Sequence, residues 1–251
     1  MPNARRVALL LALAACVPPS PALAWGAGAH RFIMRRAIEA LPPPLKPLFA
    51  ANADELAMRV VDPDLWRNAG WDEEPNHFMN FGAPELGPYP FVALPREYGA
   101  AIEKFGMTTL KRLGLLPWRE QEEFGNLRRA FEGFARGQRY AANDAVLFSA
   151  VAAHYIEDAY QPLHATINYD GQMTAQRGVH ARFETTLFNR FERRLVITAP
   201  SGPRSGTRGM PPSRSSWRAI RRRTRSSQPT SRRTPAGTCT TIRTTRSSSV
   251  R

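Results

Sequence analysis

Cysteine is almost absent from the sequence, and this excludes disulfide bonds as the main support of the fold. The only two cysteines, Cys16 and Cys239, lie near opposite ends of the 251 residues. Cys16 falls in an apolar leader segment and Cys239 in a tail of unusual composition, so no disulfide can form within the part between them. A chain of this length can form one domain with a sizeable core. We therefore expect packing or bound metal to stabilise the fold.

Long hydrophobic runs are also absent, which excludes a transmembrane helix from the expected organisation. The apolar run Val7–Val17 has eleven residues, whereas a spanning helix needs about 20. Two arginines precede this run and Ala-Leu-Ala follows it, which is the pattern of a secretory signal peptide over residues 1–24. Cleavage would leave Trp25 as the N-terminus and predicts a secreted or periplasmic protein. The alternative is a lipid anchor at Cys16, which ends a lipoprotein-like cleavage box.

Lysine and acidic residues are missing from the last 51 residues, and this absence accounts for the high net charge. The whole chain carries +14, but residues 1–200 hold 22 Lys and Arg against 21 Asp and Glu. Residues 201–251 hold 13 Arg, and Arg, Ser and Thr make up 33 of these 51 residues. Such a segment cannot bury enough apolar surface to fold. We interpret residues 200–251 as a disordered basic tail or as out-of-frame translation of a GC-rich gene, and the abrupt change favours the second.

Strand-like alternation is scarce, and helical spacing of apolar residues recurs through the rest of the chain. Residues 62–95 are rich in Pro, Gly, Asn and aromatics and are expected to form a loop with one short helix. The remainder predicts a single all-α domain over residues 25–199, built around a clustered metal site. We expect amphipathic helices over six segments, which are 30–41, 45–61, 95–113, 118–137, 141–160 and 177–196.

Histidine is scarce too, and all five histidines can be explained as metal ligands. Two of them lie in the segment His154-Tyr-Ile-Glu-Asp158-Ala-Tyr-Gln-Pro-Leu-His164. His154 and Asp158 are four residues apart, so on a helix both side chains project from one face. A proline ends that helix, and the turn after it can bring His164 back toward the same region. This segment therefore predicts the core of a metal site.

The other candidate ligands are of the same chemical types. Zinc accepts imidazole nitrogen and carboxylate oxygen, and a catalytic zinc keeps an open position for water. The sequence offers nine candidate ligand positions, which are too many for one metal ion and suit two or three. Clustered zinc ions lower the pKa of a bridging water toward ~7 and hold the oxygens of an in-line phosphoryl displacement, so the set favours phosphodiester hydrolysis. The candidate ligands are Trp25, His30, Asp64 or Asp62, His77, His154, Asp158, His164, His180 and Glu184.

The order and spacing of these residues resemble the superfamily of zinc-dependent phospholipases C and single-strand-specific nucleases. The resemblance covers about residues 25–190, and it implies a helical domain that holds three zinc ions. Its most specific element is the HxxxDxxQPLH segment. The elements that carry it are Trp25-Gly-Ala-Gly-Ala-His30, Pro63-Asp64, His77-Phe78, His154-x3-Asp158-x3-Gln161-Pro162-Leu163-His164 and His180-x3-Glu184.

The resemblance also implies a place for each ligand. The free amino group and carbonyl of Trp25 would chelate one ion together with His30, and Asp158 would bridge that ion to a second. Three residues would complete the second ion's ligands, namely Asp64, His77 and His154. Three others would hold the third ion, namely His164, His180 and Glu184.

Asp64 also lies where the superfamily orients or activates the attacking water, which makes it the candidate catalytic residue. Asp62 is the alternative for this position. Either aspartate can instead cap the helix that follows it. Four nearby aromatic residues are expected to pack in the core or in loops, with a role in a substrate cleft as the alternative. These are Phe78, Phe81, Tyr89 and Phe91.

The two branches of the superfamily imply different substrates. The five-residue step from Trp25 to His30 resembles the nucleases, whereas the pair His180 and Glu184 resembles the phospholipases. The Gly-Gly-Asn stretch of the nucleases is replaced by Asn168-Tyr-Asp-Gly171. We expect an endonuclease acting on single-stranded nucleic acid, with a phospholipase C acting on phospholipids as the alternative. Neither implies a stable protein partner.

Two further hypotheses need no catalysis. The Arg-rich tail would bind nucleic acid through its charge alone. Alternatively, the chain is an inactive truncated product that lacks a helix after the last ligand. Loss of that helix would expose apolar faces of Leu187, Phe188 and Phe191.

Overall fold

The computed structural model describes residues 25–70 and 72–197. In these residues every regular element is helical and no strand occurs. The predicted all-α fold is therefore confirmed. The predicted signal peptide (1–24) and tail (200–251) lie outside the described residues. Among the helices of the described ranges, none combines the length and the apolar character that crossing a membrane requires.

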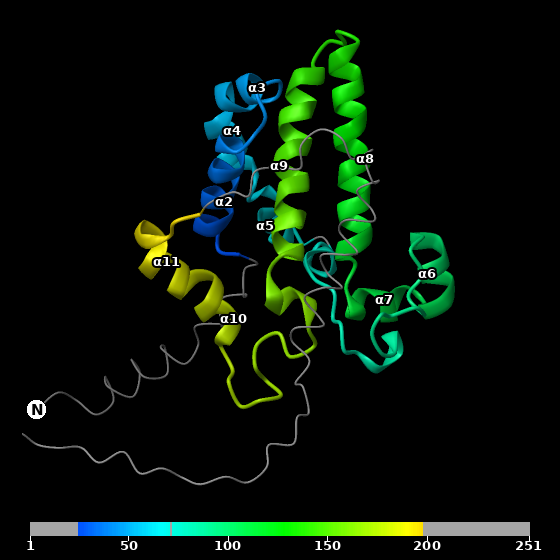
Figure 1. Cartoon of the computed structure of the whole chain (residues 1–251). Coiled ribbons are helices and arrows are strands. Elements are labelled where there is room, and N and C mark those ends of the chain that lie inside the picture. Colours follow the sequence, from blue (N-terminus) through cyan, green and yellow to red (C-terminus); the bar gives the residue numbers. More distant parts are fainter. Residues whose placement is uncertain (1–24, 71, 198–251) are drawn as a thin grey trace, which may run out of the picture.

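Two long helices, α8 (Leu116–Ala135) and α9 (Ala141–Ala159), lie side by side at the centre of the fold (Figure 1). The predicted helices 118–137 and 141–160 are thus confirmed to within two residues. The buried surface of α9 is lined by small side chains, such as Ala150 and Ala152. Small side chains let neighbouring helices approach closely. Polar residues placed on this buried face must therefore find partners inside the domain.

Three helices cover the opposite side of α9: α2 (Ala27–Glu39), α3 (Lys46–Ala51) and α4 (Ala53–Arg59) (Figure 1). Met34, Ile38, Leu56 and Val60 form a buried apolar cluster with residues of α9. The predicted helix 45–61 is divided at Asn52, whose side-chain amide donates to the carbonyl of Leu48 at 2.8 Å. A short amide side chain competes with the backbone for hydrogen bonds, and this explains the break.

A second apolar cluster lies around the N-terminal end of α8, where it includes Leu116 and Trp118. The predicted helix 95–113 forms two helices, α6 (Tyr98–Phe105) and α7 (Met107–Leu113), because Gly106 between them has a positive φ of 72°. The predicted loop 62–95 contains more structure than expected. It forms α5 (Asp62–Arg67) and two 3-10 turns, η1 (Glu74–His77) and η2 (Pro84–Leu86). Phe81 and Phe91 are buried in this cluster, as predicted.

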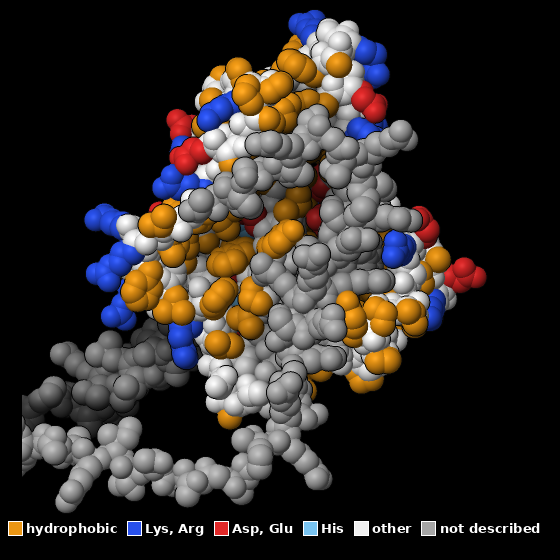
Figure 2. Space-filling model, in the orientation of Figure 1, with side chains coloured by type: hydrophobic (Ala, Val, Ile, Leu, Met, Phe, Trp, Pro, Cys, Tyr) orange, Lys and Arg blue, Asp and Glu red, His pale blue; other side chains and the backbone are white. Residues whose placement is uncertain are grey.

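The predicted helix 177–196 is irregular. It is composed of α10 (Val179–Ala181), the π-helical turn η4 (Arg182–Leu187), α11 (Phe188–Phe191) and the 3-10 turn η5 (Glu192–Arg194). Leu187 and Phe191 are exposed, which is what the hypothesis of a truncated product implies for them, and hydrophobic side chains gather over α10 and α11 in Figure 2. The expectation for Phe188 is wrong. Its ring is buried and packs edge-on against Phe32 of α2, with ring centroids 5.6 Å apart.

Candidate metal centre

Eight of the nine predicted ligands lie near one another around the C-terminal end of α9. All eight side chains are buried. They come from elements spread between α2 and η4, so tertiary packing brings them together. The eight are His30 in α2, Asp64 in α5, His77 in η1, His154 and Asp158 in α9, His164 in η3 (Pro162–Ala165), His180 in α10 and Glu184 in η4.

These side chains form three groups. Within each group, the potential ligand atoms all lie within 4.8 Å of one another. We name the groups by their place in the sequence. The N-terminal group is His30, His154 and Asp158; the central group is Asp64, His77 and His154; the C-terminal group is His164, His180 and Glu184.

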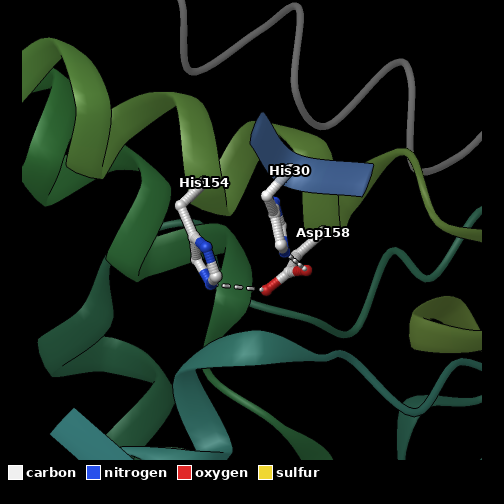
Figure 3. Close-up of side chains that lie close together, drawn as sticks. All are labelled: His30, His154 and Asp158. Atoms are coloured by element: carbon white, nitrogen blue, oxygen red, sulfur yellow. Dashed lines mark ion pairs between the residues drawn. The ribbon is translucent and has the colours of Figure 1, made fainter. Parts of the chain in front are cut away.

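Asp158 connects the first two groups through its two oxygens. Its Oδ2 lies 2.9 Å from Nδ1 of His77 and 3.3 Å from Nε2 of His154. Its Oδ1 lies 3.7 Å from Nε2 of His30. Figure 3 shows the carboxylate of Asp158 next to the ring tips of His30 and His154, whose rings stack with centroids 4.2 Å apart. One carboxylate thus faces two prospective ion positions.

Asp64 completes the central group from α5. Its Oδ1 lies 3.8 Å from Nδ1 of His77, and its Oδ2 lies 4.0 Å from Nε2 of His30. Asp62 does not join the group. It forms an ion pair with Arg59 at 3.6 Å and is partly exposed. Neither aspartate caps α5 with its side chain, so the structure favours Asp64 over Asp62 as the ligand.

The C-terminal group has the shortest distances between its ligand atoms. Oε1 of Glu184 lies 2.7 Å from Nε2 of His180 and 3.1 Å from Nε2 of His164. The two imidazole Nε2 atoms are 3.2 Å apart. The group adjoins the other two, because Nδ1 of His164 lies 3.5 Å from Oδ1 of Asp158.

Backbone carbonyls orient two of the imidazole rings. Nδ1 of His154 donates to the carbonyl of Val60 at 2.8 Å, and Nδ1 of His164 donates to the carbonyl of His77 at 2.7 Å. A carbonyl only accepts hydrogen bonds, so each Nδ1 carries the proton and each Nε2 carries a lone pair. Those lone pairs point at carboxylate oxygens and other ring nitrogens. Such second-sphere contacts orient histidine ligands in metal sites.

The unsatisfied polar atoms of the site fit a set of divalent cations. Several buried ligand atoms have no hydrogen-bond partner, including both oxygens of Asp64, Oδ1 of Asp158, Oε2 of Glu184 and Nε2 of His30. Burying carboxylates and lone pairs against one another is costly unless a cation lies between them. The donor set of imidazole nitrogen and carboxylate oxygen suits zinc and other divalent transition metals.

Burial dominates the acid–base properties of the metal-free site. It raises the pKa of Asp64 to about 7 and that of Asp158 to about 8. It lowers the pKa of His30 and of His77 well below the usual histidine value. Without a cation, burial therefore favours the protonated forms of Asp64 and Asp158 and the neutral forms of His30 and His77.

These shifts predict an unusual pH dependence for the metal-free protein. A carboxyl whose pKa is raised by folding binds more protons in the folded state, so stability falls as the pH rises toward 8. The histidines act oppositely, but only below their unfolded pKa of about 6.5. We expect metal-free stability to fall between pH 6.5 and 8, by at most about 1.4 kcal/mol per pH unit for each carboxyl. A bound divalent cation would displace these protons, so its stabilising effect should grow over the same range.

Thermal unfolding at several pH values, with chelator or with zinc, measures this dependence. Metal-free stability that rises from pH 6.5 to 8 would contradict the assignment of raised carboxyl pKa values.

Trp25, the ninth predicted ligand, lies beside the N-terminal group. Its indole Nε1 donates to the carbonyl of Glu157 at 3.0 Å, and its ring packs against Phe183 with centroids 5.5 Å apart. Glu157 immediately precedes Asp158. Chelation by the amino group and carbonyl of Trp25 stays a prediction.

Two residues outside the predicted ligand set contact the ligands. Nη1 of Arg67 lies 3.6 Å from Oδ1 of Asp64, and the three-residue spacing on a helix was the available signal. The side-chain amide of Gln161 donates to Oε1 of Glu184, and its Oε1 accepts the backbone N–H of Leu163 at 2.5 Å. Gln161 therefore connects the turn before His164 to the C-terminal group.

A cleft of about 550 Å³ opens onto the site. Its size falls within the range typical of small-molecule and cofactor sites. Phe78 lines this cleft, which corresponds to the alternative considered for it. The other lining residues are Arg67, Glu74, His77, Asn80, Arg112, Leu163, His164, Tyr169 and His180.

Comparisons with protein-family models, with curated proteins and with solved structures gave no significant match. The resemblance in ligand order stays a prediction. The grouping of the eight side chains does not depend on this resemblance.

Proposed function

We propose that this protein is a secreted or periplasmic zinc-dependent phosphodiester hydrolase, with single-stranded nucleic acid as its substrate. The observation that carries the proposal is the convergence of eight buried ligands into three groups beside one cleft. Bound zinc ions would polarise the phosphoryl oxygens and supply an activated water. A secreted form fits the site, since cleavage after Ala24 would free the amino group of Trp25.

The residues of the cleft have the chemistry needed to hold a phosphodiester. His77, His164 and His180 line the cleft together with Arg67 and Arg112, whose guanidinium groups also pair with Asp64 and Glu85. Guanidinium groups bind phosphate oxygens through paired, charge-assisted hydrogen bonds. We propose that Arg67 orients the scissile phosphate over the centre.

Asp64 is the proposed catalytic residue. Its carboxylate lies between His77 and the guanidinium of Arg67, at 3.8 and 3.6 Å from the nearest nitrogen of each. From this position it can accept a hydrogen bond from the attacking water and orient it toward the phosphate.

The composition of the cleft favours nucleic acid over phospholipid. Two guanidinium groups can contact successive phosphates of a polymer, whereas a phospholipid offers a single phosphodiester. The rings of Phe78 and Tyr169 provide surfaces on which unpaired bases can stack. The Asn80 side chain is a further lining group with hydrogen-bonding capacity.

One pair of assays tests this proposal. The full chain is incubated with single-stranded DNA and with phosphatidylcholine vesicles, each with and without chelator. We expect DNA cleavage that stops with chelator and returns with zinc. Hydrolysis of phosphatidylcholine alone would identify the phospholipase branch instead. DNA binding without cleavage that survives chelation would support the non-catalytic hypothesis. Folded protein with far less than two zinc ions per chain would overturn the metal centre itself.

A further inference from the structure

We propose that Glu157 is a positioning residue that strengthens metal binding at the N-terminal group by fixing His30 and Trp25 together. The carboxylate Oε2 of Glu157 lies 2.5 Å from Nδ1 of His30, and both side chains are buried. The backbone carbonyl of the same residue accepts the indole N–H of Trp25. This inference rests on the proposed metal centre and adds a residue that the ligand pattern does not contain.

The first step in the argument concerns the orientation of His30. A carboxylate at Nδ1 accepts the ring N–H, and this leaves the lone pair on Nε2. That atom faces Oδ1 of Asp158 at 3.7 Å and Oδ2 of Asp64 at 4.0 Å. The contact with Glu157 therefore presents the ligating nitrogen of His30 to the site. A carboxylate paired with the far nitrogen of a histidine also makes that histidine a stronger ligand.

The second step is the difference between His30 and the other oriented histidines. His154 and His164 donate Nδ1–H to neutral backbone carbonyls. His30 donates to a buried carboxylate instead. With a cation bound at the N-terminal group, the negative charge of Glu157 would act there in particular, and its removal should weaken one ion more than the others.

The third step is the position of Glu157 on α9. Glu157 and Asp158 are consecutive, so their side chains leave the helix about 100° apart. One turn of α9 thereby supplies both Asp158, which faces two ligand groups, and the Glu157 carboxylate that contacts Nδ1 of His30. Because the Glu157 carbonyl also holds the Trp25 indole, a small movement of this turn would displace both residues at once.

The test is a zinc titration of the metal-stripped full chain against a chromophoric chelator. The variants are Glu157→Gln and Glu157→Asp. The first keeps the shape of the side chain and removes its charge, and the second keeps the charge and withdraws it from His30. We expect the affinity for one zinc ion to fall by about 10–100-fold in both variants. The remaining ions should bind as in the wild type.

Glu123→Gln is the matched control. Glu123 is a buried glutamate on the adjacent helix α8, where it interacts with Arg119 and Asn126. Its replacement should leave every zinc affinity unchanged. Thermal unfolding of the metal-free forms checks that each variant is folded.

The outcomes separate the two proposals. A wild-type chain that is folded and binds no zinc would overturn the metal centre. A wild type that binds zinc, with Glu157→Gln indistinguishable from it, would overturn only the role of Glu157. Equal weakening of all ions would also overturn that role, because it would indicate a general effect on the fold.

Discussion

Replacing Asp158 with asparagine is expected to lower the rate of substrate hydrolysis by about a thousandfold. The amide keeps the size of the side chain but removes the charge that faces two ligand groups. Oδ2 of Asp158 lies within 3.3 Å of His77 and His154, and Oδ1 faces His30. Metal ions contribute several kcal/mol of transition-state stabilisation, and each ~1.4 kcal/mol corresponds to a tenfold change in rate. Steady-state assays on single-stranded DNA, with elemental analysis of zinc, measure the effect.

Asp144→Asn is the control for this experiment. Asp144 lies in the first turn of the same helix and is exposed. Its loss removes a favourable interaction with the helix dipole, worth at most about 1 kcal/mol, and leaves the centre intact. An Asp158→Asn protein with wild-type zinc content and activity would refute the shared-ligand role of Asp158.

Removing the metal is expected to lower the melting temperature by about 8–16 °C for each tightly bound zinc ion. Free ligand at about a thousand times the Kd stabilises a folded protein by about 4 kcal/mol. For a domain of this size, each kcal/mol shifts the melting temperature by about 2–4 °C. The physical reason is the convergence of unpaired carboxylate oxygens and imidazole lone pairs in the buried site. Without cations, this arrangement opposes folding.

Calorimetry of the full chain with zinc, with chelator, and after adding back either zinc or calcium measures this effect. Zinc should restore the melting temperature. Calcium should not, because it prefers a shell of six to eight oxygens and the site is rich in nitrogen. An unchanged melting temperature after complete removal of zinc would show that the ions do not support the fold.

Local spacing predicted those parts of the molecule that depend on one element. The apolar periodicity identified α8 and α9, and the four-residue step from His154 to Asp158 placed both on one buried face of α9. The step from His180 to Glu184 likewise gave two ligands of one group. Such relations are fixed by helix geometry, so they can be inferred without knowledge of the rest of the chain.

The remaining features depend on packing and could not be inferred in this way. Asp62 and Asp64 leave α5 on different sides, about 200° apart, and only the docking of α5 decides which one enters the site. The contact between Glu157 and His30 joins residues 127 positions apart in the sequence. Nothing in the spacing of α9 distinguishes Glu157 from a solvent-exposed acidic residue.

The π-helical turn η4 allows one helical segment to meet two structural requirements, one for metal ligation and one for packing. His180 and Glu184 must keep their spacing for the C-terminal group, whereas Phe188 must face Phe32 of α2. In a π turn each N–H bonds five residues back rather than four, so the residues after it are rotated relative to a continuous α-helix. Glu184 lies within η4 and Phe188 directly follows it, so this turn sets the packing register after the ligand pair. If the same residues formed a regular α-helix instead of a π turn, the ring of Phe188 would turn away from α2.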